Sequence, residues 1–146
     1  MTKHYVALII RDVEGRYLTL RHAKKVERQW RFPGGKVDSG EFPIMAAARE
    51  LFEELGVIAY GLNLIKVTED HFTDAETWKG HFFEVLSYSG EIRLMEPEKH
   101  NDWTYMDVFD LRNANAHPEY EVAMEQTYTS NATVCIVSST PSTARS

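Results

Sequence analysis

The sequence is poor in cysteine, in long hydrophobic runs and in positive charge. Cys135 is the only cysteine among 146 residues, so an internal disulfide is excluded and we expect a cytoplasmic location. The first twelve residues, MTKHYVALIIRD, contain only a short apolar run and no small-residue cleavage site. We therefore expect neither a signal peptide nor a segment that spans a membrane.

Acidic residues outnumber basic ones. The 22 Asp and Glu against 16 Lys and Arg give a formal net charge of -6. This balance argues against a protein that coats nucleic acid, although it leaves room for a local basic patch. With 43% hydrophobic and 26% charged residues, the composition is that of a globular chain.

No linker or internal repeat divides the chain, and its length suits one domain. We expect a single domain over residues 1–146, in which residues from about 129 onward form a partly mobile tail rich in Ser and Thr. Within this tail, the run VCIV at residues 134–137 predicts a short strand.

Strand and helix signals together predict an α/β fold. The β-prone runs at residues 5–11 and 17–22 flank DVEG, where Gly15 favours a hairpin turn. β-branched and aromatic residues predict three further strands, at residues 62–72, 77–88 and 103–108. A second helix is expected at residues 120–128.

The clearest helix signal lies between Pro43, which suits a first helical turn, and Gly56, which suits a C-terminal cap. At about 100° per residue, this helix has one apolar and one acidic face. The apolar face contains Ile44, Ala48, Leu51, Phe52 and Leu55, with Met45 at its edge. The acidic face contains Glu50, Glu53 and Glu54.

The acidic face, in the segment RELFEE at residues 49–54, needs an explanation. Glu50 and Glu54 would repel each other by about 0.2–0.5 kcal/mol on an exposed helix. A solvated face is one interpretation, but no lysines are interleaved and a glycine-rich loop bearing Glu41 leads into the helix. Clustered carboxylates beside glycine carbonyls form an all-oxygen site, which suits Mg²⁺ or Mn²⁺.

The segment GKVDSGEFPIMAAARELFEELGV resembles the Nudix box, G-x5-E-x7-R-E-U-x-E-E-x-G-U, where U is apolar. Every fixed position is met, by Gly35, Glu41, Arg49, Glu50, Leu51, Glu53, Glu54, Gly56 and Val57. The preceding WRFPGG is similar to the aromatic-x-x-PGG approach that is usual in the Nudix hydrolase family. The order of the expected elements fits the family to about residue 128.

The resemblance implies an α/β/α sandwich around a mixed sheet, with the box forming loop–helix–loop. It also implies metal-dependent hydrolysis of a diphosphate bond in a nucleoside diphosphate linked to another group. Carried over to this sequence, Glu50, Glu53 and Glu54 would bind the metal with the Gly34 carbonyl. Glu50 would also activate the attacking water, and Arg49 would orient the carboxylates by pairing with Glu53 or Glu41.

A second segment, EPEKHNDWTYMDVFDL at residues 96–111, resembles a stretch found in nucleoside triphosphate diphosphatases of the MutT-like branch. In such enzymes an acidic residue of this loop reaches the metal site. The resemblance makes Glu98 the first candidate and Glu96 the second. The alternative is an exposed polar loop before a strand.

The residues that would bind the base and the phosphates are harder to identify from the sequence. Trp30, Phe32, Trp78, His81 and Phe83 are candidates for stacking on a base, and core packing is the alternative for each. Arg21, Lys24, Lys25 and Arg28 could face a triphosphate, or lie in a solvated basic loop.

The leading hypothesis is hydrolysis of a (deoxy)nucleoside triphosphate to a nucleoside monophosphate and pyrophosphate. The alternatives are a hydrolase of nucleotide sugars or dinucleoside polyphosphates, and a nucleotide-sensing module without catalysis. The expected partners are a small nucleotide substrate and, by family habit, a second copy of the chain in a homodimer. Neither nucleic acid nor a membrane is expected as a partner.

Overall fold

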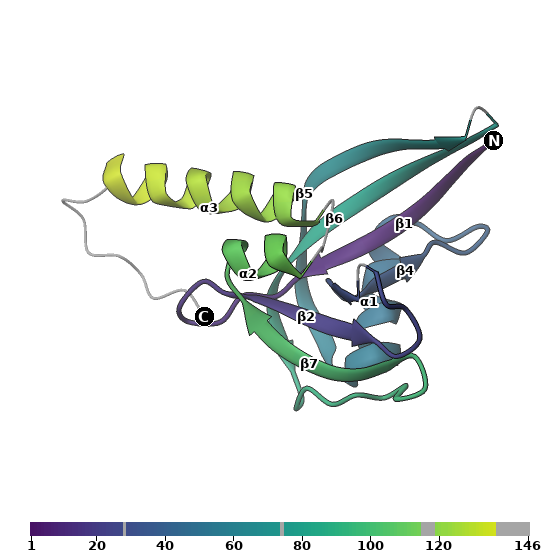
Figure 1. Ribbon diagram of the computed structural model, residues 1–146, viewed down its shortest axis with the longest axis horizontal. Helices are drawn as coiled ribbons and strands as arrows, with labels where there is room; N and C mark the ends of the chain where they lie inside the picture. The colour runs from purple at the N-terminus through teal and green to yellow at the C-terminus, as the bar shows by residue number, and fades with distance from the viewer. Residues whose placement is uncertain (28, 74, 115–118, 137–146) are drawn as a thin grey trace.

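The computed structural model describes residues 1–27, 29–73, 75–114 and 119–136, with the side chains of residues 72, 73 and 128–136 left out. Its centre is a four-stranded mixed sheet in the order β4-β1-β6-β5. These strands are β4 Gly34–Lys36, β1 Thr2–Ile9, β6 Glu76–Ser89 and β5 Ile58–Thr73. β1 and β6 run parallel, and the other neighbours are antiparallel (Figure 1).

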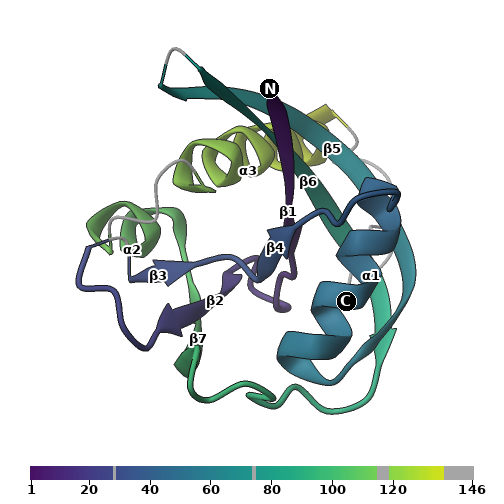
Figure 2. The same cartoon turned by 90° about the vertical axis from the view of Figure 1, so that its right-hand side faces the viewer.

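A smaller antiparallel sheet has the order β3-β2-β7. It consists of β3 Trp30–Arg31, β2 Tyr17–His22 and β7 His100–Met106. Three helices complete the described part of the chain, namely α1 Pro43–Leu55, α2 Val108–Asn113 and α3 Glu119–Ile136. Figure 2 shows α1 on one side of the mixed sheet and α3 on the other.

The mixed sheet is buried on both faces, because β1 alternates between two hydrophobic clusters. Val6 and Leu8 pack with Leu51 and Leu55 of α1, whereas Ala7 and Ile9 pack with side chains of α2 and α3, among them Leu111, Val122 and Ala123. A strand covered on both faces reads as a continuous apolar run, as VALII does. The expected α/β class, with a mixed sheet between helices, is confirmed.

The hairpin expected around DVEG forms its turn but not a shared ladder. Gly15 has φ 80 in this turn, and the Asp12 carboxylate accepts the backbone N–H groups of Glu14 and Arg16. Beyond an isolated bridge between Arg11 and Tyr17, β1 and β2 diverge into different sheets. Longer-range pairing decides this, because β1 pairs with β6 and β2 pairs with β7.

The helix expected at residues 43–56 is confirmed, and Gly56 caps α1 with φ 69. Its predicted apolar face is confirmed at Leu51 and Leu55 but wrong at its other members. The residues that α1 buries are Ala46, Ala47, Leu51, Glu54 and Leu55, whereas Ile44, Met45, Ala48 and Phe52 are exposed. Glu54 turns inward because it accepts a hydrogen bond from Gly34, and the small alanines allow α1 to approach the sheet closely.

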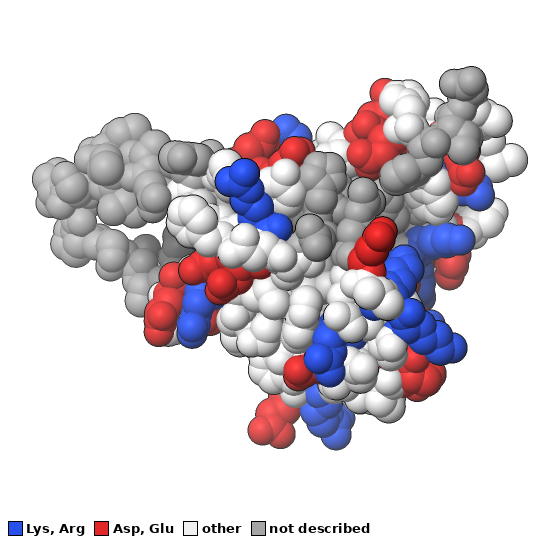
Figure 3. All heavy atoms as spheres, viewed as in Figure 1, with Lys and Arg blue, Asp and Glu red and all other residues white. Residues whose placement is uncertain are grey.

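The strands expected at 62–72, 77–88 and 103–108 are present, although β5 begins at Ile58 and β7 begins at His100. β7 also ends earlier than expected, at Met106, because Asp107 caps α2, which begins at Val108. The strand expected at VCIV is wrong, because α3 continues through residues 134–136, and residue 137 lies outside the described part. Within the described residues, no helix combines the length and apolarity needed to cross a bilayer. On the face seen in Figure 3, acidic and basic side chains are interspersed.

Candidate active site

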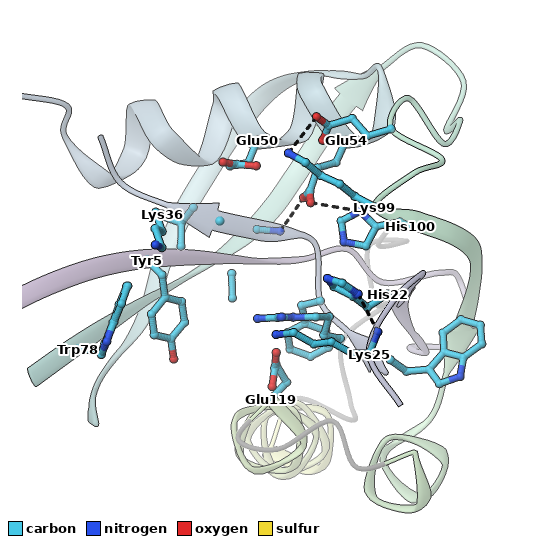
Figure 4. Close-up of a pocket in the computed structure, with 18 of the residues that line it drawn as sticks. Tyr5, His22, Lys25, Lys36, Glu50, Glu54, Trp78, Lys99, His100 and Glu119 are labelled. Atoms are coloured by element: carbon cyan, nitrogen blue, oxygen red, sulfur yellow. Dashed lines mark hydrogen bonds and ion pairs between the residues drawn. The ribbon is translucent and has the colours of Figure 1, made fainter. Parts of the chain in front are cut away.

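A cavity of about 1160 Å³ lies between α1, the glycine-rich strand β4, β1, the segment before β3 and the start of α3. Glu50 and Glu54 enter it from α1, and Glu119 enters from α3 (Figure 4). Four cationic side chains also line it, those of Lys25, Arg31, Lys36 and Lys99. A cavity that combines buried carboxylates with several cations suits a ligand that is itself polyanionic.

Glu54 is the most deeply buried carboxylate of α1, with 5% of its side chain exposed. Its Oε1 atom accepts the N–H of Gly34 at 2.7 Å. Burial, and then the charge of Glu50, raises the pKa of Glu54 to about 8 despite this hydrogen bond. A carboxyl with this pKa is mostly protonated near pH 7, unless a cation stabilises its charged form.

His100 lies beside Glu54 without forming an ion pair at neutral pH. Its Nδ1 atom is 3.6 Å from Glu54 Oε2, which is longer than a good hydrogen bond. Burial, followed by the nearby His22, lowers the pKa of His100 to about 4. Both partners are therefore largely uncharged near pH 7, and His100 acts as a packed neutral neighbour of Glu54.

Glu50 lies one helical turn before Glu54 and rests against the backbone of Gly35. A Cβ atom built on Gly35 would collide with the Glu50 carboxylate, so this glycine is required for the close approach. Burial raises the pKa of Glu50, while Arg49 opposes the shift. Arg49 Nη1 donates to Glu50 Oε1 at 2.9 Å.

Arg49 connects the carboxylates of the box. It donates to both oxygens of Glu41, at 2.9 and 3.0 Å, to Glu53 at 3.2 Å and to the Lys36 carbonyl at 2.9 Å. The pairings of Arg49 with Glu41 and with Glu53, expected from the sequence, are both present. The hydrogen bond to Glu41, followed by the charge and hydrogen bond of Glu50, raises the pKa of Arg49 above its usual range despite partial burial, so the guanidinium stays charged.

The structure does not gather the three glutamates into one cluster. Glu53 points away from the cavity toward Arg49, and its side chain is 46% exposed. Glu98 is exposed and does not line the cavity. Glu96, the second candidate, does line it, and its charge contributes to the raised pKa values of Glu50 and Glu54. Glu96 also pairs with Lys99 at 3.2 Å.

Some of the candidate substrate residues line the cavity and others do not. Trp30 and Phe32 line the cavity, although Phe32 is buried. Phe83 is buried in the cluster beneath α1, which supports the core-packing interpretation. Arg21 lies over the Trp30 ring at 5.7 Å and donates to Asn101 at 2.7 Å, outside the cavity. Arg28 lies outside the described residues.

Several cavity residues are not visible in the sequence motifs. These are His22, Lys36, Asp70, His100 and Glu119. Tyr5 hydrogen-bonds to Asp70 across 65 residues of chain. Only the pairing of β1 with β6, and of β6 with β5, brings these two residues together. No local sequence signal could have identified them as partners.

Among the described residues, no group of three His, Cys, Asp or Glu is already arranged as a metal site. The residues nevertheless fit a hard divalent cation. Glu50 and Glu54 offer oxygen ligands. Burial, and then the charges of neighbouring carboxylates, raise the pKa values of both, and a cation would relieve this repulsion.

The family model of the NUDIX domain matches residues 1–127, so the chain belongs to the NUDIX family. It is a Nudix hydrolase of the MutT-like kind. A solved MutT NUDIX hydrolase from Burkholderia pseudomallei has a TM-score of 0.73 and 29% identity to the chain. The match covers 86% of this chain and 98% of that one.

Two curated relatives carry more specific names. An RNA pyrophosphohydrolase from Bartonella bacilliformis is 39% identical over 119 residues, which are 66% of this chain and 69% of the relative. An 8-oxo-dGTP diphosphatase from Haemophilus influenzae is 47% identical over 58 residues, which are 38% of this chain and 43% of the relative. Both names describe hydrolysis at a chain of phosphates.

Proposed function

We propose that the protein hydrolyses a nucleoside 5′-triphosphate to a nucleoside monophosphate and pyrophosphate, with Mg²⁺ or Mn²⁺ as cofactor. The observation that carries this proposal is the pair of Glu54, which is buried, and Glu50, which is half-buried, one helical turn apart in a cavity that also contains Lys25, Arg31, Lys36 and Lys99. Lys25, Arg31 and Lys99 would bind the phosphates, and the carboxylates would face the bond to be cleaved. A cytoplasmic location, suggested by the single cysteine, is part of this proposal.

The metal would be held by Glu50 and Glu54, with Glu53, Glu96 and the Gly34 carbonyl as further candidate ligands. When bound, a divalent cation neutralises phosphate charge and lowers the pKa of a coordinated water. Arg49 has a separate role. Through its bonds to Glu41 and Glu50 it fixes the carboxylate of Glu50 against Gly35. Such fixed positioning is what phosphoryl transfer requires from a protein.

Glu50 is the proposed general base. It would accept a proton from the attacking water as the water oxygen bonds to phosphorus and pyrophosphate leaves with the electrons of the cleaved P–O bond. Its side chain is held by Arg49 but remains in the cavity. Glu54, by contrast, is occupied by the Gly34 N–H and is almost fully buried. Glu50 is therefore better placed to exchange protons.

A second candidate substrate is an RNA chain with a 5′-triphosphate end. The observation that favours it is the relative named as an RNA pyrophosphohydrolase, which matches over 119 residues, about twice the 58 matched by the 8-oxo-dGTP diphosphatase. The bond cleaved would be of the same kind. The two substrates differ in size: with RNA, the nucleotides that follow the first one would have to extend out of the cavity.

A panel of nucleoside triphosphates, nucleotide sugars, dinucleoside polyphosphates and a short 5′-triphosphate RNA tests the proposal. Phosphate release is measured with and without added inorganic pyrophosphatase, in Mg²⁺, in Mn²⁺ and in excess chelator. We expect metal-dependent release that is seen only with pyrophosphatase, and release by Glu50→Gln that is slower by about 100-fold or more. Phosphate release without pyrophosphatase, or full turnover in chelator, would contradict the proposal.

A further inference from the structure

The end of the cavity away from α1 has a wall formed by Tyr5, Asp70 and Trp78. Tyr5 of β1, Gly80 of β6 and Thr68 of β5 are paired across three neighbouring strands. A Cβ atom on Gly80 would collide with the Tyr5 ring and with Thr68 Oγ1. The glycine therefore provides the space in which the phenol crosses β6 and reaches β5.

The phenol of Tyr5 is fixed from several directions. Its ring packs against Trp78 and Phe82, with both centroid distances 6.3 Å. Its hydroxyl donates to Asp70 Oδ2 at 3.2 Å and lies 3.4 Å from Thr68 Oγ1. Lys3 and Lys36 in turn lie over the Trp78 ring, at 5.4 and 5.6 Å. Trp78 thus supports Tyr5 instead of offering a bare stacking surface.

This arrangement leaves a wall that accepts hydrogen bonds. The single hydroxyl proton of Tyr5 is directed at Asp70 Oδ2. The groups that can still bind a ligand are Asp70 Oδ1 and the remaining lone pairs of Asp70 Oδ2 and of the Tyr5 hydroxyl, all of which are acceptors. Glu119, also buried, adds a second carboxylate to the lining of the same cavity. Acceptors of this kind disfavour phosphate, and favour a neutral group that presents N–H donors.

The wall is also at a suitable distance from the carboxylates of α1. Gly34, which binds Glu54, pairs with Ala7, and Tyr5 lies two residues further along β1. This offset is roughly 7 Å along the strand, and Asp70 lies on β5, two strand spacings or roughly 10 Å from β1. A nucleoside fills a gap of this order between its 5′ phosphates and the edge of its base.

Among the common bases, guanine matches such a wall best. Its N1–H and N2–H₂ groups are adjacent donors, which one carboxylate can accept together. Adenine and cytosine each place a ring-nitrogen acceptor beside the amino group, and uracil places its one N–H between two carbonyls. We infer that Asp70, held by Tyr5, is a specificity-determining residue that selects guanine nucleotides over adenine nucleotides. The inference rests on the proposed nucleotide substrate.

Steady-state kinetics of GTP against ATP, at saturating Mg²⁺, tests the inference. We expect wild type to prefer GTP in kcat/KM by about 10-fold or more, the discrimination that one bidentate contact provides. Asp70→Asn presents one donor and one acceptor, so it should lose this preference and shift the ranking toward ATP. The matched control is Glu69→Gln, an exposed carboxylate on the neighbouring residue of β5, which should keep the wild-type ranking.

Two further measurements keep the outcomes distinct. If wild type hydrolyses no nucleoside triphosphate, the proposed function fails. The inference about guanine is then tested separately, by calorimetric measurement of GTP and ATP binding in chelator. Equal affinity for the two nucleotides, or no binding of either, would overturn it, as would an Asp70→Asn enzyme that keeps its GTP preference. Tyr5→Phe keeps the carboxylate but removes its orienting donor, and should lower the preference less than Asp70→Asn does. Tyr5→Phe also tests the wall if Asp70→Asn fails to fold.

Discussion

Glu50 and Glu54 share a side of α1, but their surroundings give them different roles. Glu54 is buried under the Gly34 N–H and beside a neutral His100. Glu50 contacts Arg49 and lies over Gly35 at the cavity surface. One carboxyl is thus positioned by the protein interior, and the other by a charged hydrogen-bond network at the site.

Replacing Glu50 by Gln should reduce kcat by about 100-fold or more, the lower range for losing acid–base assistance. KM should change far less, because Lys25, Arg31 and Lys99 still bind the phosphates. The control is Glu98→Gln, whose carboxylate lies outside the cavity and whose loss should be much milder. Steady-state kinetics on the best substrate of the panel measures both. If Glu98→Gln were the less active of the two variants, the general base would have to be assigned to the loop and not to α1.

The pKa of Glu54 predicts a pH dependence of the metal-free protein. Its pKa is about 8 in the folded protein, against 4.5 for an ordinary glutamate carboxyl. The folded state therefore binds the proton more tightly, so this stabilisation is complete below about pH 4.5 and is lost as the pH rises through 8. Between pH 6.5 and 8 the free energy of unfolding should fall by up to about 1.4 kcal/mol per pH unit.

Denaturant melts in chelator, across this pH range, measure the effect. Glu54→Gln cannot lose a proton and should remove the slope, which separates Glu54 from other groups that titrate nearby. His100 has a pKa of about 4 in the folded protein, against an ordinary value of 6.5. It therefore contributes a rise in stability with pH, opposite in sign to the Glu54 effect, which fades through the lower end of this window. A slope that persists in Glu54→Gln would assign the dependence to another group.

For the helices and strands, local sequence signals predicted where an element begins and ends. Contacts with residues distant in the sequence decided which face of the element is buried. Pro43 and Gly56 act within one turn of α1, so its ends could be predicted. Its rotation depends on Gly34, twenty residues from Glu54, and no periodicity contains that contact. The two-residue strand β3 and the three-residue strand β4 are too short to leave a pattern.

The site shows the same division. The glutamates and Arg49 could be predicted because the box places them at fixed spacing on one helix. The inward turn of Glu54, the approach of Glu96 and the contact between Tyr5 and Asp70 depend on strand pairing and loop packing. The Tyr5–Asp70 contact spans 65 residues, and the residues between them carry no motif that relates the two.

The corrected orientation of α1 predicts a difference between two adjacent apolar residues. Leu51 is fully buried in the cluster beneath α1, whereas Phe52 is 56% exposed. Leu51→Ala should therefore lower the free energy of unfolding by about 2–5 kcal/mol, the usual cost of a buried leucine. Phe52→Ala should cost much less, and equilibrium denaturant unfolding compares them. Equal losses would contradict the observed rotation.

For the whole molecule, the cavity is assembled from both sheets, α1 and the first turn of α3. No single element contains it, so a ligand that binds there should stabilise the complete fold by mass action. We expect Mn²⁺ to raise the thermal midpoint of the wild type in a concentration-dependent way. The rise should be reduced in the double variant Glu50→Gln with Glu54→Gln. An unchanged rise in that variant would place the metal elsewhere.

The closeness of Gly35 to Glu50 offers a way to separate the presence of a carboxylate from its placement. Gly35→Ala adds one methyl group where the Glu50 carboxylate now lies, while the net charge and every glutamate are kept. Because the obstructed group is the end of a flexible side chain, the fold should tolerate the change and Glu50 should swing aside. Such an enzyme should bind its substrate yet turn it over slowly, which would make it suitable for trapping the intact complex in a crystal.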